Sequence, residues 1–129
     1  MNAKKTLPSG AVLEIDLLDY EDAWGVFQTV AKTVDTLQLD LKSIDFENFT
    51  NADILGFKGP VCQILSSKEV MDAAWLCFKK CTYDGRRIVS KDIFSAKESR
   101  GDVIPAAFYA IKENITPFLD GLLSYLKTK

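Results

Sequence analysis

The carboxyl-terminal region carries an apolar repeat that few folds can accommodate. Apolar side chains recur there at spacings of three and four residues: Ile104, Phe108, Ile111, Ile115, Phe118, Leu122 and Leu126. Because this spacing places them on one helical face, it predicts a single α-helix over about residues 102–126. Pro117 lacks a backbone N–H, so we expect the helix to be kinked near Glu113. Such a face must pack on something, which predicts a core or self-association stripe of Phe108, Ile111, Ile115, Phe118 and Leu122.

The amino-terminal residues predict a β-hairpin followed by a helix. Pro8-Ser9-Gly10 is typical of a turn, and the alternation of Ala11, Leu13, Ile15 and Leu17 is typical of a half-buried strand, so we expect a hairpin over residues 3–18. Asp19 is a suitable N-cap for a helix over about residues 20–37. The expected buried face of that helix consists of Tyr20, Ala23, Trp24, Phe27, Val30, Ala31, Val34 and Leu37.

Residues 61–101 predict a helical region that contains a second, small hairpin. Ser66 and Glu69 have the spacing of a capping box and open a predicted helix. Asp84-Gly85 has the sequence of a two-residue hairpin turn. With the elements above, the pattern predicts an α+β fold: one mainly helical domain spanning residues 1–129, with an N-terminal β-hairpin and a small second hairpin.

Residues 38–60 have no regular apolar period, although they contain Phe46, Phe49 and Phe57. Short helical turns that place the three rings in the core would explain the segment. An irregular segment of this length is also often functional, so the alternative is a partner-binding surface made of Phe46, Phe49 and Phe57.

The sequence offers no recognisable catalytic, cofactor-binding or metal-binding site. It contains no histidine, which removes the commonest general base near neutral pH and a frequent zinc ligand. Cys62, Cys77 and Cys81 lack the spacing of a zinc site, so we expect reduced, buried thiols. No apolar run has the length of a signal peptide or a membrane span, and we expect a cytoplasmic protein that does not enter membranes.

Charge is distributed unevenly along the chain. Residues 1–58 contain ten acidic and five basic residues, whereas residues 59–129 contain eight acidic and eleven basic residues. Chance would explain this, and so would head-to-tail association of an acidic patch with a basic one. A basic cluster that could contact nucleic acid consists of Lys79, Lys80, Arg86, Arg87 and Lys91. Since the sequence pI is about 5.1, a solvated hairpin explains that cluster better than nucleic acid binding.

Motifs spread over nearly the whole chain, residues 38–60 excepted, resemble one protein family. They are Lys5-Thr6-Leu7-Pro8-Ser9-Gly10-Ala11, the capped helix start at residues 19–23, Leu65-Ser66-Ser67-Lys68-Glu69, Cys81-Thr82-Tyr83-Asp84-Gly85 with Phe94, and Lys112-Glu113-Asn114-Ile115-Thr116-Pro117-Phe118. In order and spacing these motifs resemble those of the small tail assembly chaperones of long-tailed, siphovirus-type bacteriophages. The motifs are structural and include no catalytic signature.

This resemblance implies a non-enzymatic protein of the host cell cytoplasm. Such chaperones bind the long, aggregation-prone tape measure protein during tail assembly, and they self-associate, so the expected partners are the tape measure protein, further copies of this chain and other tail proteins. One alternative is a structural tail or head–tail completion protein that stays in the virion. A less favoured alternative is a phage regulator that binds nucleic acid.

Overall fold

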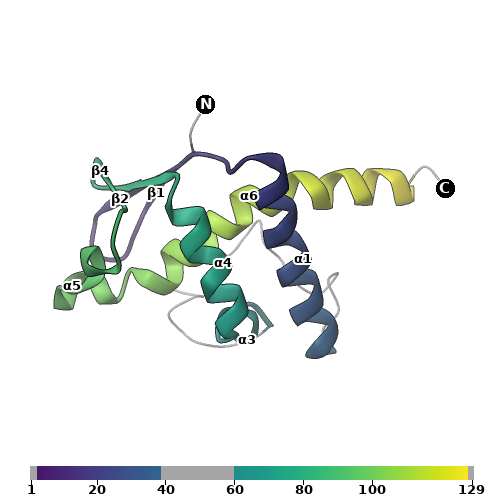
Figure 1. The fold of residues 1–129 in the computed structure, drawn as a ribbon, viewed down its shortest axis with the longest axis horizontal. Coiled ribbons are helices and arrows are strands. Elements are labelled where there is room, and N and C mark those ends of the chain that lie inside the picture. Colours follow the sequence, from purple (N-terminus) through teal and green to yellow (C-terminus); the bar gives the residue numbers. More distant parts are fainter. Residues whose placement is uncertain (1–2, 39–59, 128–129) are drawn as a thin grey trace.

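The computed structural model describes the backbone of residues 3–38 and 60–127, and side chains within residues 3–38 and 62–121 (Figure 1). It has the predicted α+β fold, mainly helical, with an antiparallel sheet formed by two hairpins. The fold class expected from the sequence is therefore confirmed.

The sheet joins the N-terminal hairpin to a second hairpin in the latter half of the sequence. Its strands are β1 (Ala3–Thr6), β2 (Val12–Ile15), β3 (Cys81–Tyr83) and β4 (Arg86–Arg87), in the order β1-β2-β3-β4. All neighbouring pairs are antiparallel, and β2 pairs with β3 through Leu13 opposite Tyr83 and Ile15 opposite Cys81. The N-terminal hairpin is thus held by a strand almost seventy residues further along the chain.

Both hairpin turns have the backbone that their sequences predict. Gly10 adopts a φ of 95°, and its N–H donates to the Leu7 carbonyl over 2.8 Å. Asp84 and Gly85 both have positive φ, 51° and 81°, as a two-residue turn matched to the twist of the strands requires. The Asp84 side chain also accepts a hydrogen bond from the Val12 N–H, which ties the second turn to β2.

The helices follow the predicted ranges closely. They are α1 (Tyr20–Thr36), α3 (Pro60–Leu65), α4 (Lys68–Phe78), the 3-10 helix η2 (Lys91–Phe94), α5 (Lys97–Arg100) and α6 (Val103–Lys127). Helices α1 and α4 lie side by side and both contact α6, which crosses behind them (Figure 1).

Helix α6 is continuous through Pro117 and changes direction along its length (Figure 1). Pro117 lacks the N–H that would donate to the Glu113 carbonyl, and one position earlier the Thr116 hydroxyl donates to the Lys112 carbonyl over 2.6 Å. In its first half, α6 is buried on every side, since Pro105, Ala106, Ala107 and Tyr109 are as inaccessible as the predicted stripe. Helices α1 and α4 pack against α6. Lys5 of β1 contacts the ring of Tyr109 in α6.

The structure corrects the predicted buried face of α1. The residues that enter the core are Ala23, Val26, Val30 and Val34, whereas Tyr20, Trp24 and Leu37 are exposed. The core face is therefore rotated toward Val26, and the larger aromatic side chains lie at its border. Leu17, predicted to be buried, follows the end of β2 and is exposed.

The N-terminus of α4 differs from the predicted capping box by one residue. Ser67, not Ser66, is the N-cap, and its hydroxyl accepts from the Val70 N–H over 3.4 Å. Ser66 instead donates to the Gln63 carbonyl at the end of α3. Only Ser66 has a glutamate three residues later, but Ser66 directly follows α3 and its hydroxyl bonds to that helix, so the N-cap of α4 is the next serine.

Candidate protein-binding surface

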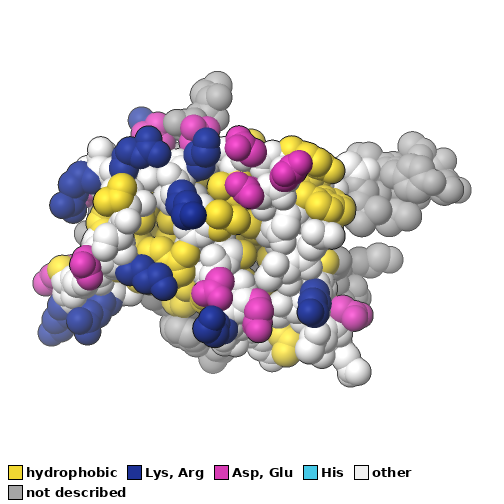
Figure 2. All heavy atoms as spheres, in the orientation of Figure 1, with side chains coloured by type: hydrophobic (Ala, Val, Ile, Leu, Met, Phe, Trp, Pro, Cys, Tyr) yellow, Lys and Arg dark blue, Asp and Glu magenta, His cyan; other side chains and the backbone are white. Residues whose placement is uncertain are grey.

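Four aromatic rings form a partly exposed cluster where α1 meets the second half of α6. We call Tyr20, Trp24, Phe27 and Phe118 the aromatic surface. Tyr20 is 69% exposed and Trp24 40% exposed, while Phe27 and Phe118 are half-buried. In Figure 2 hydrophobic side chains lie at the surface over the start of α1. Large rings left in water are the usual sign of a binding surface.

The rings of the aromatic surface contact one another in a fixed arrangement. Trp24 stacks on Phe27 with centroids 5.2 Å apart. Phe118 lies nearly perpendicular to both, 5.3 Å from Trp24 and 5.6 Å from Phe27, and Tyr20 lies 6.2 Å from Phe118. Such pairs add about 0.5–1.5 kcal/mol beyond area burial. The surface is therefore already formed before any partner binds, and a partner need not order it.

The helical sequence of α1 positions three of these rings. Tyr20, Trp24 and Phe27 are spaced by four and three residues, so they lie in one row beside the core face. Phe118 comes directly after Pro117, where α6 leaves the fully buried part of its path. Because the row sits beside the core face, each ring keeps one side on the protein and one side toward solvent.

At the opposite end of α6, a buried carboxylate connects the start of the helix with both hairpins. Asp102 is fully buried, and we call its contacts with Ser9 and Tyr83 the Asp102 anchor. The Ser9 N–H donates to it over 3.0 Å, the Tyr83 hydroxyl over 2.5 Å, and the Ser9 hydroxyl also donates to it. Three donors compensate the loss of water around the carboxylate. No local sequence pattern predicts this anchor, because its partners are distant in sequence.

A second buried polar side chain fixes α6 to the start of α1. The Asn114 side-chain oxygen accepts from the Leu18 N–H over 2.9 Å, and its amide donates to the Ala110 carbonyl. This places the residues that precede α1 against α6, next to the aromatic surface. A polar residue within an apolar helical stripe is the sequence signal that could have identified it.

The three cysteines are buried, and none of them forms a disulfide bond. Burial raises the pKa of Cys77 and of Cys81 to about 12, so both thiols stay protonated near neutral pH. The Cys81 thiol also donates to the Cys77 carbonyl. Within the described residues, no three potential metal ligands of the His, Cys, Asp or Glu types gather at one place.

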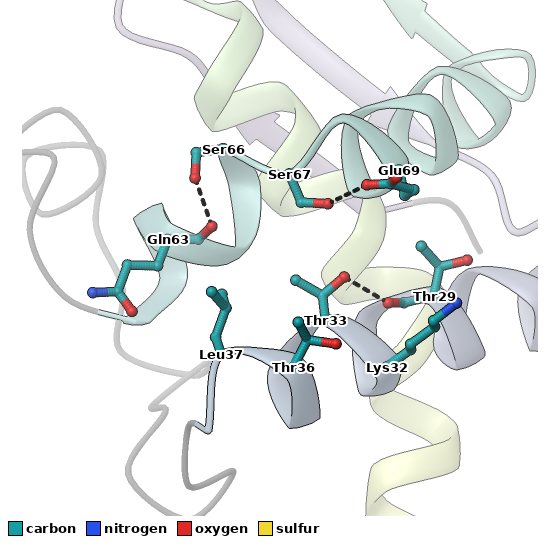
Figure 3. A pocket seen from close by; sticks show the side chains of 9 residues that line it. All are labelled: Thr29, Lys32, Thr33, Thr36, Leu37, Gln63, Ser66, Ser67 and Glu69. Atoms are coloured by element: carbon teal, nitrogen blue, oxygen red, sulfur yellow. Dashed lines mark hydrogen bonds between the residues drawn. The ribbon is translucent and has the colours of Figure 1, made fainter.

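A groove of about 480 Å³ lies between the second half of α1 and the α3–α4 connection (Figure 3). Its lining is rich in hydroxyl groups, but these are bonded within their own elements. Thr33 donates to the Thr29 carbonyl, Ser66 to the Gln63 carbonyl, and Ser67 to Glu69. These three hydroxyl groups are therefore already bonded within the protein.

Basic side chains gather on the side of the protein away from α1 (Figure 2). The predicted cluster at Lys79, Lys80, Arg86, Arg87 and Lys91 is exposed around β4. Two of its members already contact the fold, because Arg87 donates to the Lys79 carbonyl and Lys91 lies 5.3 Å from the Trp75 ring centroid. These contacts suit a solvated hairpin.

The residues proposed from the sequence fall into three groups. Phe108, Ile111 and Ile115 lie in the hydrophobic core of the domain, and Phe118 belongs to the aromatic surface. Phe46, Phe49 and Phe57 lie outside the described residues, and the side chain of Leu122 does as well. The stripe is thus core in its first half and partly exposed at Phe118.

Comparisons with family models, with curated proteins and with solved structures find no match to this chain. Among the described residues, no helix has the length and apolarity needed to cross a membrane.

Proposed function

We propose that this chain is a non-enzymatic tail assembly chaperone of a long-tailed bacteriophage, acting in the host cell cytoplasm on the tape measure protein. The aromatic surface carries the proposal, because its rings form an apolar site on a small domain. A tape measure protein that has not yet assembled exposes apolar helix faces, and such a site can cover them and so keep it soluble. The motifs that resemble the chaperone family support the same role.

The proposal includes a homo-oligomer. Its support is the separation of charge, with basic side chains around β4 and acidic side chains near the start of α1 (Figure 2). Exposed charge pairs are individually weak and are screened by salt. Sedimentation at low and high salt tests this part: looser association at high salt supports it, and a monomer at both contradicts it.

Co-expression with the tape measure protein of the same phage tests the function. We expect a soluble complex, and loss of tape measure solubility when this chain is omitted. Two variants locate the contact: Trp24→Ala in the aromatic surface, and Phe46→Ser with Phe49→Ser and Phe57→Ser in the segment proposed from the sequence. Circular dichroism must first show that each variant is folded.

The composition of finished virions provides a test that could contradict the chaperone function. A chaperone leaves before the particle is complete, so mass spectrometry of purified virions should not find this chain. Abundance in virions together with no tape measure complex would replace the chaperone with a structural tail or head–tail completion protein.

A further inference from the structure

The two sequence stretches that carry the rings of the aromatic surface contain charges of a single sign. The rings come from two stretches, residues 6–31 and residues 113–121, and neither stretch contains a lysine or an arginine. The basic residues that directly flank the two stretches are Lys5, Lys32 and Lys112. The acidic residues of the two stretches are Glu14, Asp16, Asp19, Glu21, Asp22, Glu113 and Asp120. Figure 2 shows acidic side chains beside the hydrophobic ones over the start of α1.

A negative border around an apolar centre selects for a partner of opposite sign. Charge of one sign raises the encounter rate with a cationic partner and opposes an acidic one. The exposed faces of Tyr20 and Trp24 can also receive a cation directly. The chain already uses this contact elsewhere, since Lys5 lies 5.6 Å from the Tyr109 ring centroid and Lys91 lies over Trp75.

The backbone of the aromatic surface indicates the shape of the partner. The surface is built from α1 and α6, whose internal N–H and C=O groups are bonded within each helix. It therefore offers no row of backbone groups to an extended peptide, as a strand edge would. A helix satisfies its own backbone and needs only side-chain contacts. The row of Tyr20, Trp24 and Phe27 has the spacing that packs against a second helix.

We propose that the aromatic surface binds an amphipathic helix whose apolar stripe is flanked by lysine and arginine. This inference rests on the proposed function, and it specifies which helices of the tape measure protein the chain would recognise: those with basic borders. The acidic residues at the start of α1 face the basic border, and the four rings cover the apolar stripe.

Synthetic peptides test this inference with the whole chain and without any phage protein. The first peptide is a helix with leucine and phenylalanine in one stripe and lysine on both borders. The second has glutamate in place of each lysine, and the third has the composition of the first with the stripe scrambled. We expect the first to bind at least about tenfold more tightly than either of the others in calorimetry. Emission from Trp24 should shift on binding.

Variants of the chain locate the contact. Trp24→Ala and Tyr20→Ala should each weaken binding of the lysine peptide, and Glu21→Lys should reduce its advantage over the glutamate peptide. Val89→Ala is the matched control, because Val89 is 87% exposed but lies beside β4, far from α1 in the sequence. That variant should bind the lysine peptide as the unmodified chain does.

Several outcomes would overturn the inference. Equal binding of the lysine and glutamate peptides removes the charge argument, and binding of the scrambled peptide shows nonspecific attraction. Unchanged binding by Trp24→Ala places the contact elsewhere. If Trp24→Ala instead dissociates an oligomer of the free chain, a second copy occupies the surface.

The two proposals can fail separately. If the lysine peptide binds at Trp24 and no tape measure complex forms, the surface stands and the chaperone function fails. If a tape measure complex forms and tolerates Trp24→Ala, the function stands and the inference about this surface fails.

Discussion

The start and the second half of α6 differ in how they place side chains that are costly to accommodate. At its start, the Asp102 carboxylate is fully buried and is compensated by donors from Ser9 and Tyr83. Further along, Phe118 joins rings that remain partly in water although apolar burial would stabilise the fold. The first arrangement holds the domain together, and the second leaves apolar area available for another molecule. Stability and binding are thus divided between the start and the second half of one helix.

The largest expected effect tests whether the first half of α6 is the structural half. Phe108→Ala removes a buried ring and leaves a cavity, so the free energy of unfolding should fall by about 3 kcal/mol or more. Chemical denaturation measures it. Phe118→Ala is the matched control at the half-buried position and should cost clearly less. Equal losses for the two variants would break the distinction between the halves.

The Asp102 anchor predicts the next largest effect. Asp102→Asn keeps the shape but presents an N–H₂ group to donors, so at least one buried donor loses its acceptor, at a cost of about 2 kcal/mol. Tyr83→Phe, which removes one donor, should cost about 1 kcal/mol. Asp120→Asn, at an exposed position, is the control and should leave stability nearly unchanged. An unchanged free energy of unfolding in the Asp102→Asn variant would mean that the anchor does not stabilise the fold.

We expect alkaline pH to destabilise the buried core before it affects the aromatic surface. Burial raises the pKa of Cys77 and Cys81 to about 12, so the folded protein keeps protons that the unfolded chain loses above about pH 9. The stability that the two protonated thiols contribute is complete below the pKa of a thiol in the unfolded chain. It is lost as the pH rises toward 12. We expect a loss on the order of 1 kcal/mol per thiol by pH 10.

Burial and the nearby Asp102 also raise the pKa of Tyr83, which acts in the same direction above about pH 10. Denaturation at pH 8, 9 and 10 measures the combined slope. A Cys77→Ala, Cys81→Ala double variant is the control, and its stability should change less over this range. The same slope in both proteins would contradict the assignment to the thiols.

The smallest expected stability effect belongs to the aromatic surface. Trp24→Ala removes a ring that is 40% exposed, so unfolding should become easier by only about 1 kcal/mol. Binding of the lysine peptide should nevertheless weaken strongly. Thermal unfolding and calorimetry on the same sample give both values. A large loss of stability with little change in binding would assign Trp24 to the core. The aromatic surface would then serve stability and not binding.

Periodicity predicted the elements well because the helices and hairpins have strong local signals. The turn at Asp84-Gly85 and the long helix through Pro117 depend on neighbours in sequence, and both are present. The face of α1 was predicted less well, since the apolar residues cover more than one side of the helix. The smaller row of Ala23, Val26 and Val30 enters the core, and helix packing decides this, which no local pattern reports.

The Asp102 anchor was beyond sequence reasoning for a different reason. Asp102 directly precedes α6, at a position where aspartate is common as an N-cap, so its place in the sequence does not indicate distant partners. Its actual donors come from Ser9 and Tyr83, which only the assembled sheet brings to it. The aromatic surface could have been anticipated in part, because Tyr20 and Trp24 lie at one border of the predicted face.

The pairing of the first hairpin with the rest of the chain also constrains how the protein forms. Ser9 and Asp102 are 93 residues apart in the sequence. Strand β2 can pair with β3 only after β3 has been synthesised. Closing a loop of that length costs about 4 kcal/mol of chain entropy beyond a constant, and it comes before most of the reward in contacts. During synthesis on the ribosome, the N-terminal hairpin therefore emerges without its partners. The domain becomes complete only after α6 has left the exit tunnel, so the N-terminal hairpin reaches its final contacts only after α6 has been synthesised.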